Sequence, residues 1–294
     1  MSGNVYDALG ERHGDDTHWA FGTGFDTDAV EVTAAVPDGA DVGDLAAYCL
    51  MLGDDALICS HRLTEWVSNA PELEEEVALA NTALDLLGQA RLLLARAGHL
   101  AGDGDEDRLA YWRGDAEFRH VALAELDDEL DFARCVARLL VFASWRLALL
   151  HRLRGCADPV VAAVAERGVK ELAYHRDYAA RWVVRLGDGT PDSHERMRAA
   201  LDWVWPSVGE LFGCSEVERR LAGAGVAVDP GTVRDEVDAV LDQVLAAATL
   251  TRPRLPPAGP VGGRGGRDGV HTEAFGHLLA EMQSLARAHP GATW

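Results

Sequence analysis

Glu171 and His175 stand four residues apart in the middle of a long helical segment. Carboxylate-bridged di-iron proteins place Glu-x-x-His on a helix, because residues three apart aim both side chains at one metal. Here the residue three before His175 is Leu172, which has no atom that can bind iron. The segment therefore belongs to a working di-iron centre, to a degenerate one, or to an ordinary helical protein.

The other helical segments offer few ligands for a metal. A complete site of this kind uses four carboxylates and two histidines from four helices. The second long segment contains Asp85, followed four residues later by Gln89, an amide where a metal helix needs imidazole. The first offers Asp54 and Asp55, and the third has no carboxylate in its middle. The sequence thus disfavours a working centre.

Two interpretations of these acids remain open. One is an independent metal-binding enzyme that uses Asp55, Asp85, Glu171 and His175. The other, which the missing ligands favour, is a buried polar core in which these side chains and Gln89 satisfy one another by hydrogen bonds. Three basic residues are available to pair with the acids, namely Arg62, Arg91 and Lys170.

Helical periodicity dominates the chain from Leu45 onward. Apolar residues recur at three and four over four long segments, expected at 45–66, 71–97, 128–153 and 159–186. Pro71 and Pro159 suit the first position of a helix. Shorter helices are expected at 105–111, 191–212, 216–222, 230–250 and 272–288. The pattern predicts an all-α bundle with extra C-terminal helices.

The first 44 residues differ from the rest in composition. They carry ten acidic residues against Arg12 alone, with glycines and without a sustained apolar period. Such a segment cannot bury enough apolar surface to fold alone, which predicts a mobile acidic extension. Residues 45–294 are expected to form a single helical domain.

Net charge, the length of apolar runs and the cysteine pattern disfavour several classes of protein. A net charge of -21 disfavours nucleic acid or an anionic membrane as a partner. No continuous apolar run reaches the ~18–20 residues that span a bilayer, and the N-terminus has no apolar signal region, so a cytoplasmic protein is expected. Five scattered cysteines without CxxC pairs predict reduced thiols.

Residues 262–267, Gly-Gly-Arg-Gly-Gly-Arg, could clasp a phosphate or act as an RGG segment. The segment is short and isolated within an acidic chain. A flexible loop is the favoured interpretation.

Several motifs together resemble the C subunits of multicomponent phenylacetyl-CoA 1,2-epoxidases, bacterial ring-epoxidising monooxygenases of phenylacetate degradation. The resemblance covers residues from about 47 to 294. It is carried by Leu52–Asp55, Arg62–Trp66, Ala70–Glu74, Leu84–Arg91, Lys170–His175, Arg185–Thr190, Gly225–Pro230, His271–Glu273 and Leu279–Gln283.

The resemblance implies a ferritin-like bundle that is a degenerate copy of the catalytic A subunit of such complexes. It places the former ligand positions of the di-iron centre at Ala56, Leu86, Gln89, Ala143, Leu172 and His175. It implies a non-catalytic structural subunit without a metal or cofactor of its own. Iron is expected in the A subunit, the expected partner, with other subunits and a reductase in the complex. Contact with the acyl-CoA substrate is a further possibility.

Overall fold

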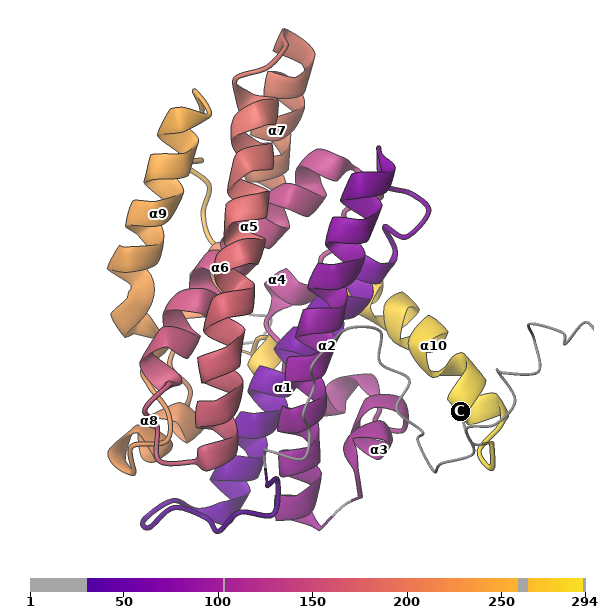
Figure 1. Ribbon diagram of the computed structural model, residues 1–294, viewed down its shortest axis with the longest axis vertical. Helices are drawn as coiled ribbons and strands as arrows, with labels where there is room; N and C mark the ends of the chain where they lie inside the picture. Colours follow the sequence, from indigo (N-terminus) through magenta and orange to yellow (C-terminus); the bar gives the residue numbers. More distant parts are fainter. Residues whose placement is uncertain (1–30, 103, 259–263, 293–294) are drawn as a thin grey trace, which may run out of the picture. The chain divides into compact units, whose positions relative to one another are not determined.

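Four long helices form the centre of the protein. The computed structural model describes residues 31–102, 104–258 and 264–292. Within them the long helices are α1 (Val42–Thr64), α2 (Leu73–Ala101), α5 (Phe132–Leu153) and α6 (Pro159–Gly187). α1 packs along α2, α5 packs along α6, and α2 also contacts α6 (Figure 1). None of the described residues belongs to a β-strand, which confirms the predicted all-α, ferritin-like fold.

Three of these helices begin where an aspartate caps free backbone N–H groups. Asp41 accepts from the N–H of Asp44 at 2.9 Å, and Asp131 and Asp158 cap α5 and α6 in the same way. A carboxylate there satisfies orphan donors and complements the helix dipole. Pro159 follows its cap as the first residue of α6, as the sequence predicted.

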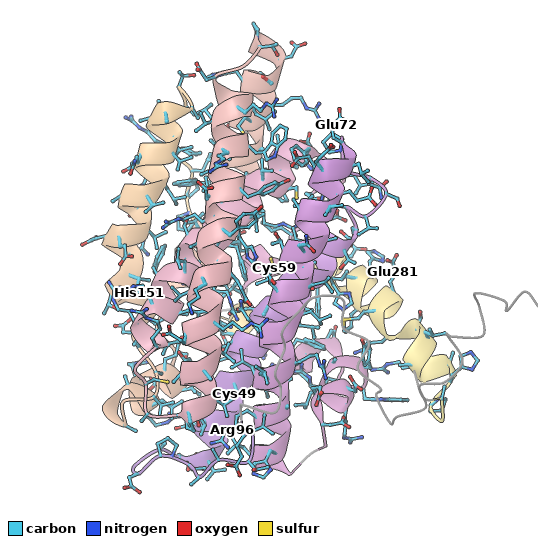
Figure 2. All side chains as sticks on the ribbon, in the orientation of Figure 1. Cys49, Cys59, Glu72, Arg96, His151 and Glu281 are labelled. Carbon is cyan, nitrogen blue, oxygen red and sulfur yellow. The ribbon has the colours of Figure 1, made fainter. Side chains whose placement is uncertain are left out.

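Helix α5 is the central element, since 18 of its 22 residues are buried. A helix buried on all sides must place its polar groups against partners inside the protein. Arg138 follows this rule, because its Nη2 donates to Asp128 Oδ2 at 2.9 Å and both side chains are almost fully buried. Thiols also lie in this core, including Cys49 and Cys59 of α1 (Figure 2).

Shorter helices fill the remaining connections. Between α2 and α5 lie α3 (Glu106–Tyr111), η3 (Asp115–Glu117) and α4 (Ala122–Glu125). After α6 come α7 (Pro191–Val204), η4 (Trp205–Phe212), α8 (Glu216–Gly223), η5 (Pro230–Val233), α9 (Arg234–Ala247), η6 (Gly266–Asp268) and α10 (Glu273–Ala288). α9 packs against α5 and α6, whereas α10 contacts α1 and α3.

Two proline positions correct the predicted helix boundaries. Pro71 precedes α2 instead of opening it, because turns continue past Trp66, whose Nε1 donates to Asp128 Oδ2 at 3.2 Å. The single helix expected over 191–212 changes at Trp205 into the 3-10 helix η4. Pro206 explains the change, because it lacks the N–H that an α-helix requires.

The N-terminal boundary of the helical domain lies earlier than residue 44. Arg96 on α2 donates from Nη1 to the carbonyl oxygens of Val32 at 2.8 Å and Ala34 at 2.6 Å. Val36 and Ala40 pack against the core. Residues 31–44 are therefore held by the bundle, and the rest of the predicted mobile extension, residues 1–30, lies outside the described residues.

α2 is the one described helix whose length and composition would suffice to cross a bilayer. Half of its most apolar stretch is buried in the protein. The sequence contains no continuous apolar run here because Asp85 and Arg91 interrupt it.

Candidate functional site

Arg146 lies fully buried at the centre of the four-helix bundle. From α5, its Nε donates to Gln89 Oε1 on α2 at 3.0 Å, and its Nη1 donates to the carbonyl oxygen of Leu52 on α1 at 3.1 Å. Gln89 Nε2 in turn donates to Glu171 Oε2 on α6 at 2.9 Å. One hydrogen-bonded chain thus joins all four helices; we call it the arginine centre.

The six predicted former ligand positions are all buried in this core, but they do not fit a di-iron centre. Ala56, Leu86, Ala143 and Leu172 are completely buried hydrocarbon side chains without a donor atom. Gln89 is engaged by Arg146 and by Glu171. The buried guanidinium of Arg146 would also repel an iron cation. A metal ion in a low-dielectric core needs negatively charged ligands around it.

His175 is the one former ligand position that holds a usual ligand for iron. It is 1% exposed, and its Nε2 lies 2.9 Å from Asp85 Oδ2, which ties α6 to α2. Its Nδ1 is buried without a hydrogen-bond partner. His175 and Asp85 therefore form a bond between two helices beside the arginine centre.

Asp55 corrects the prediction of one shared polar core. Its carboxylate accepts from both terminal nitrogens of Arg267, at 3.0 and 2.8 Å, and from the N–H of Val121 at 2.9 Å. The C-terminal part of the chain brings Arg267 to this side of α1. Asp55 is therefore bound apart from Asp85, Glu171 and His175, and the four residues do not present the joint ligand set of a metal enzyme.

The basic partners expected for these acids are also different. Arg62 donates to Glu65 at 2.8 Å, and Arg91 pairs with Glu106 at 3.5 Å. Lys170 is exposed on α6. Glu171 instead accepts from Arg167 at 2.7 Å, the residue one helical turn earlier.

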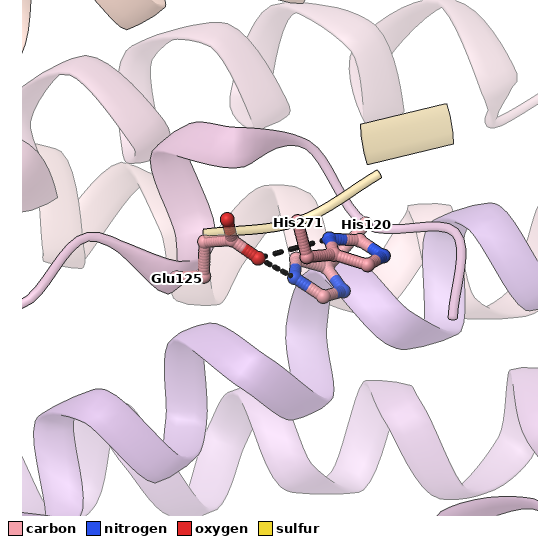
Figure 3. Close-up of side chains that lie close together, drawn as sticks. All are labelled: His120, Glu125 and His271. Atoms are coloured by element: carbon pink, nitrogen blue, oxygen red, sulfur yellow. Dashed lines mark hydrogen bonds and ion pairs between the residues drawn. The ribbon is translucent and has the colours of Figure 1, made fainter. Parts of the chain in front are cut away.

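A second polar cluster, absent from the prediction, contains His120, Glu125 and His271 (Figure 3). Glu125 Oε2 lies 2.7 Å from His120 Nε2 and 2.9 Å from His271 Nδ1. Glu125 Oε1 accepts from the N–H of Thr272 at 2.7 Å. This histidine–glutamate cluster fastens the segment before α10 to α4.

Burial and hydrogen bonding shift the pKa of Glu125 in opposite directions. Burial pushes the pKa of its carboxyl upward, but hydrogen bonds from His120 and His271 outweigh this and hold the pKa at about 2. Burial lowers the pKa of His120. The carboxylate is therefore ionised at neutral pH and acts as the shared acceptor.

The types of these residues could bind a divalent cation, but their geometry favours the hydrogen-bonded arrangement. The imidazole rings of His120 and His271 are stacked, with centroids 4.1 Å apart and planes 15° from parallel. An imidazole binds a metal in its own plane, so one ion between stacked rings would lie out of the plane of both. The ring of Phe275 packs against the cluster, with its centroid 4.5 Å from the centroid of the His120 ring.

Residues 264–267 of the Arg-Gly segment are bound to the core and are not the flexible loop that the sequence favoured, and residues 262 and 263 lie outside the described residues. Arg267 donates to Asp55 and also to the carbonyl oxygens of Met51 and Arg119. A Cβ on Gly266 would lie 2.2 Å from the carbonyl oxygen of His120. Glycine is required at this approach, which places Arg267 over α1.

Two comparisons with known proteins match most of the chain. The family model described as phenylacetic acid catabolic protein matches residues 29–294. The chain belongs to this family. It is also 42% identical over 253 residues to the C subunit of the 1,2-phenylacetyl-CoA epoxidase of Escherichia coli (strain K12), covering 86% of this chain and 100% of the relative. The resemblance of the motifs is thereby confirmed.

Only part of this site was recognisable from the sequence. The former ligand positions follow from helix spacing and family motifs. Arg146 lies three residues after Ala143, in a segment whose lack of carboxylates was its one informative feature. His120 and His271 are far apart in the chain; the sole signal was the motif His271–Glu273, which marked the family and not a contact with Glu125.

Proposed function

We propose that this chain is a non-catalytic structural subunit of a multicomponent monooxygenase that epoxidises the ring of phenylacetyl-CoA. In this proposal it pairs with the related catalytic subunit, which holds the di-iron centre and supplies the oxygen chemistry. The arginine centre is the observation that carries the proposal. It places a buried guanidinium against Gln89, one of the predicted ligand positions, and four of the other positions hold hydrocarbon side chains where a catalytic relative needs ligands.

The buried ion pairs suit a rigid supporting role. Arg96 with Asp158, Arg138 with Asp128, and Arg267 with Asp55 each join separate parts of the chain. Such pairs are costly to break, because the loss of one partner leaves a buried charge uncompensated. They would hold the bundle in one shape, which gives the catalytic partner a firm surface to pack against in the cytoplasm.

Metal analysis of purified proteins tests this function. The full chain should purify with no more than trace iron, whereas its complex with the catalytic subunit of the same organism should contain iron that, once the two are separated, stays with the catalytic partner. The complex with its reductase should consume NADPH and epoxidise phenylacetyl-CoA, and this chain with the reductase should not. Near-stoichiometric iron in the isolated chain, or turnover without the catalytic partner, would contradict the proposal.

A further inference from the structure

Both ring nitrogens of His271 face oxygen atoms that can only accept hydrogen bonds. Its Nδ1 lies 2.9 Å from Glu125 Oε2, and its Nε2 lies 3.2 Å from the carbonyl oxygen of Phe118. A carbonyl oxygen has no proton to donate. Glu125 has none either, because its carboxyl is ionised at neutral pH. The surroundings of His271 therefore offer two acceptors and no donor to its ring nitrogens.

A neutral imidazole cannot satisfy both of these acceptors. It carries one N–H, so its other nitrogen directs a lone pair at an oxygen atom. With Nδ1 unprotonated, the lone pair would point at the charged carboxylate of Glu125. With Nε2 unprotonated, it would point at the carbonyl oxygen of Phe118. The side chain of His271 is only 4% exposed, so water offers little compensation, whereas an imidazolium donates at both positions.

The stacked neighbour His120 has the opposite surroundings. Its Nε2 lies against Glu125, but its Nδ1 is buried without a hydrogen-bond partner. A second N–H on this ring would be a buried donor with nothing to bond to. Burial lowers the pKa of His120, and the nearby His271 acts in the same direction. The stacked pair therefore carries one positive charge, on His271, opposite the one negative charge of Glu125.

The other charged groups around the cluster have partners of their own. Arg62 of α1 donates from Nε to the carbonyl oxygen of Glu125 at 3.0 Å and from Nη2 to that of Ala274 at 2.9 Å. Arg119 donates from Nη1 to the carbonyl oxygen of Phe118 at 2.8 Å. The remaining groups form ion pairs, namely Arg62 with Glu65, Asp54 with Arg113, Asp55 with Arg267, and Glu273 with His277. Among the described residues, Glu125 is thus the carboxylate that compensates His271.

The cluster fastens one end of α10. The N–H of Thr272 donates to Glu125 Oε1 at 2.7 Å, and the buried ring of Phe275 packs against both imidazole rings. Further along α10, Gln283 Nε2 donates to carbonyl oxygens of α3 and of the segment after it, at 3.0 and 2.9 Å. An amide does not titrate near neutral pH. A change of protonation at His271 therefore acts on the start of α10 and not on its later turns. We call the bonds of Glu125 to His271 and Thr272 the α10 latch.

We propose that His271 is an imidazolium ion at neutral pH and that its proton makes the α10 latch sensitive to pH. The inference is independent of the proposed function. The folded chain sets both N–H groups of the imidazolium against acceptors and the unfolded chain does not, so folding favours the protonated ring. This contribution is present while the ring is protonated and is lost as the pH rises and the proton leaves. The carboxylate of Glu125 then has no cation beside it, and the start of α10 is held less firmly.

NMR of the full chain carrying isotope-labelled histidine tests the protonation state. The two ring nitrogens of an imidazolium both carry hydrogen, whereas a neutral ring has one bare nitrogen with a very different chemical shift. The signals are assigned by their absence from His271→Gln and His120→Gln. At about pH 7, His271 should give the spectrum of an imidazolium and His120 that of a neutral ring. If His271→Gln does not fold, the wild-type ring signal is assigned through its bonded backbone atoms.

Hydrogen exchange of backbone amides tests the latch. His271→Gln removes the titrating ring but keeps a side-chain donor for Glu125, and its exchange at each pH provides the correction for the intrinsic effect of pH. As the wild-type ring loses its proton above neutral pH, protection at the start of α10 should fall roughly tenfold relative to this variant, as the loss of a charge-assisted hydrogen bond predicts. Protection around Gln283 should not change. His120→Gln is the matched control, and it should show the same fall as the wild type because it retains His271.

Other results would overturn defined parts of the proposal. A neutral His271 ring at about pH 7 would show that it is not an imidazolium. An imidazolium whose loss leaves exchange at the start of α10 unchanged would exclude the latch. If a chelator alters the His271 signal of the purified protein, the cluster binds a metal ion and the assigned protonation is wrong.

Discussion

The arginine centre and the histidine–glutamate cluster are both buried and polar, yet they relate to the sequence in opposite ways. The arginine centre lies where helix spacing locates a metal site, but a buried guanidinium occupies it and four of the six predicted ligand positions there hold hydrocarbon side chains. The histidine–glutamate cluster consists of residue types that bind metals, but it lies outside the four-helix motif and its rings are stacked on each other. Position in the fold and residue type must therefore agree before a metal centre can be inferred.

The two regions also differ in how their charges are compensated. Glu125 is ionised and accepts hydrogen bonds from two histidines and one backbone N–H. Arg146 bonds to a neutral amide and to a carbonyl, and its Nη2 is buried without a hydrogen-bond partner. We expect the first arrangement to stabilise the fold strongly and the second to contribute little.

The largest effect is expected at Glu125. The pKa of its carboxyl is about 2 in the folded protein, against an ordinary 4.5, which corresponds to about 3 kcal/mol of stability. Because the folded pKa is the lower one, this contribution is present above pH 4.5 and is lost as the pH falls toward 2. Glu125→Gln should therefore lower the free energy of unfolding by about 3 kcal/mol at pH 7, and urea denaturation at several pH values measures it.

The control for this change is its dependence on pH. The difference between wild type and Glu125→Gln should shrink steadily between about pH 5 and pH 3, because the wild-type carboxylate loses its advantage there. A difference of constant size over that range would show that the effect comes from shape and not from charge.

A smaller effect is expected at His175, at the edge of the arginine centre. His175→Ala removes the partner of Asp85 between α2 and α6, and should cost about 1–2 kcal/mol. Thermal unfolding of the variant measures the loss, and Asp85→Asn provides the matched change on the other side of the bond. Equal stability of His175→Ala and wild type would show that this bond does not help hold α2 to α6.

The smallest effect is expected for Arg146→Met. A methionine of similar length removes the cost of burying a guanidinium, so the free energy of unfolding should change by less than about 1 kcal/mol. Arg146→Ala leaves a cavity, so it should lower the free energy of unfolding by about 2–4 kcal/mol more than Arg146→Met does. Urea denaturation of both variants then distinguishes the effect of lost volume from the effect of lost charge. A large loss with methionine would make the arginine centre as important for stability as the histidine–glutamate cluster and would remove the contrast between them.

Local sequence signals were sufficient for most of the secondary structure. Asp158 followed by Pro159 predicted the start of α6, because the cap and the fixed proline φ act within a few residues. Leu172 stands where the motif has a ligand, and this was an equally local signal, since it depends on the side-chain type at one position. The boundary near Pro71 was less accurate, because the turns after α1 include Trp66, which bonds to the distant Asp128. The change to a 3-10 helix at Pro206 had a local cause, the missing N–H, that the prediction did not use.

The sequence by itself determined most of the helices, the family and the side-chain types at the six predicted former ligand positions, five of which hold no usual iron ligand, since these depend on periodicity, caps and side-chain type. Only the tertiary structure decided which charges meet. Asp55 binds Arg267, Glu125 joins His120 to His271, and Arg146 reaches Gln89, all through contacts that helix packing creates. A buried charge accepts any partner of suitable geometry, so its choice follows from how the helices pack and not from its neighbours in the chain.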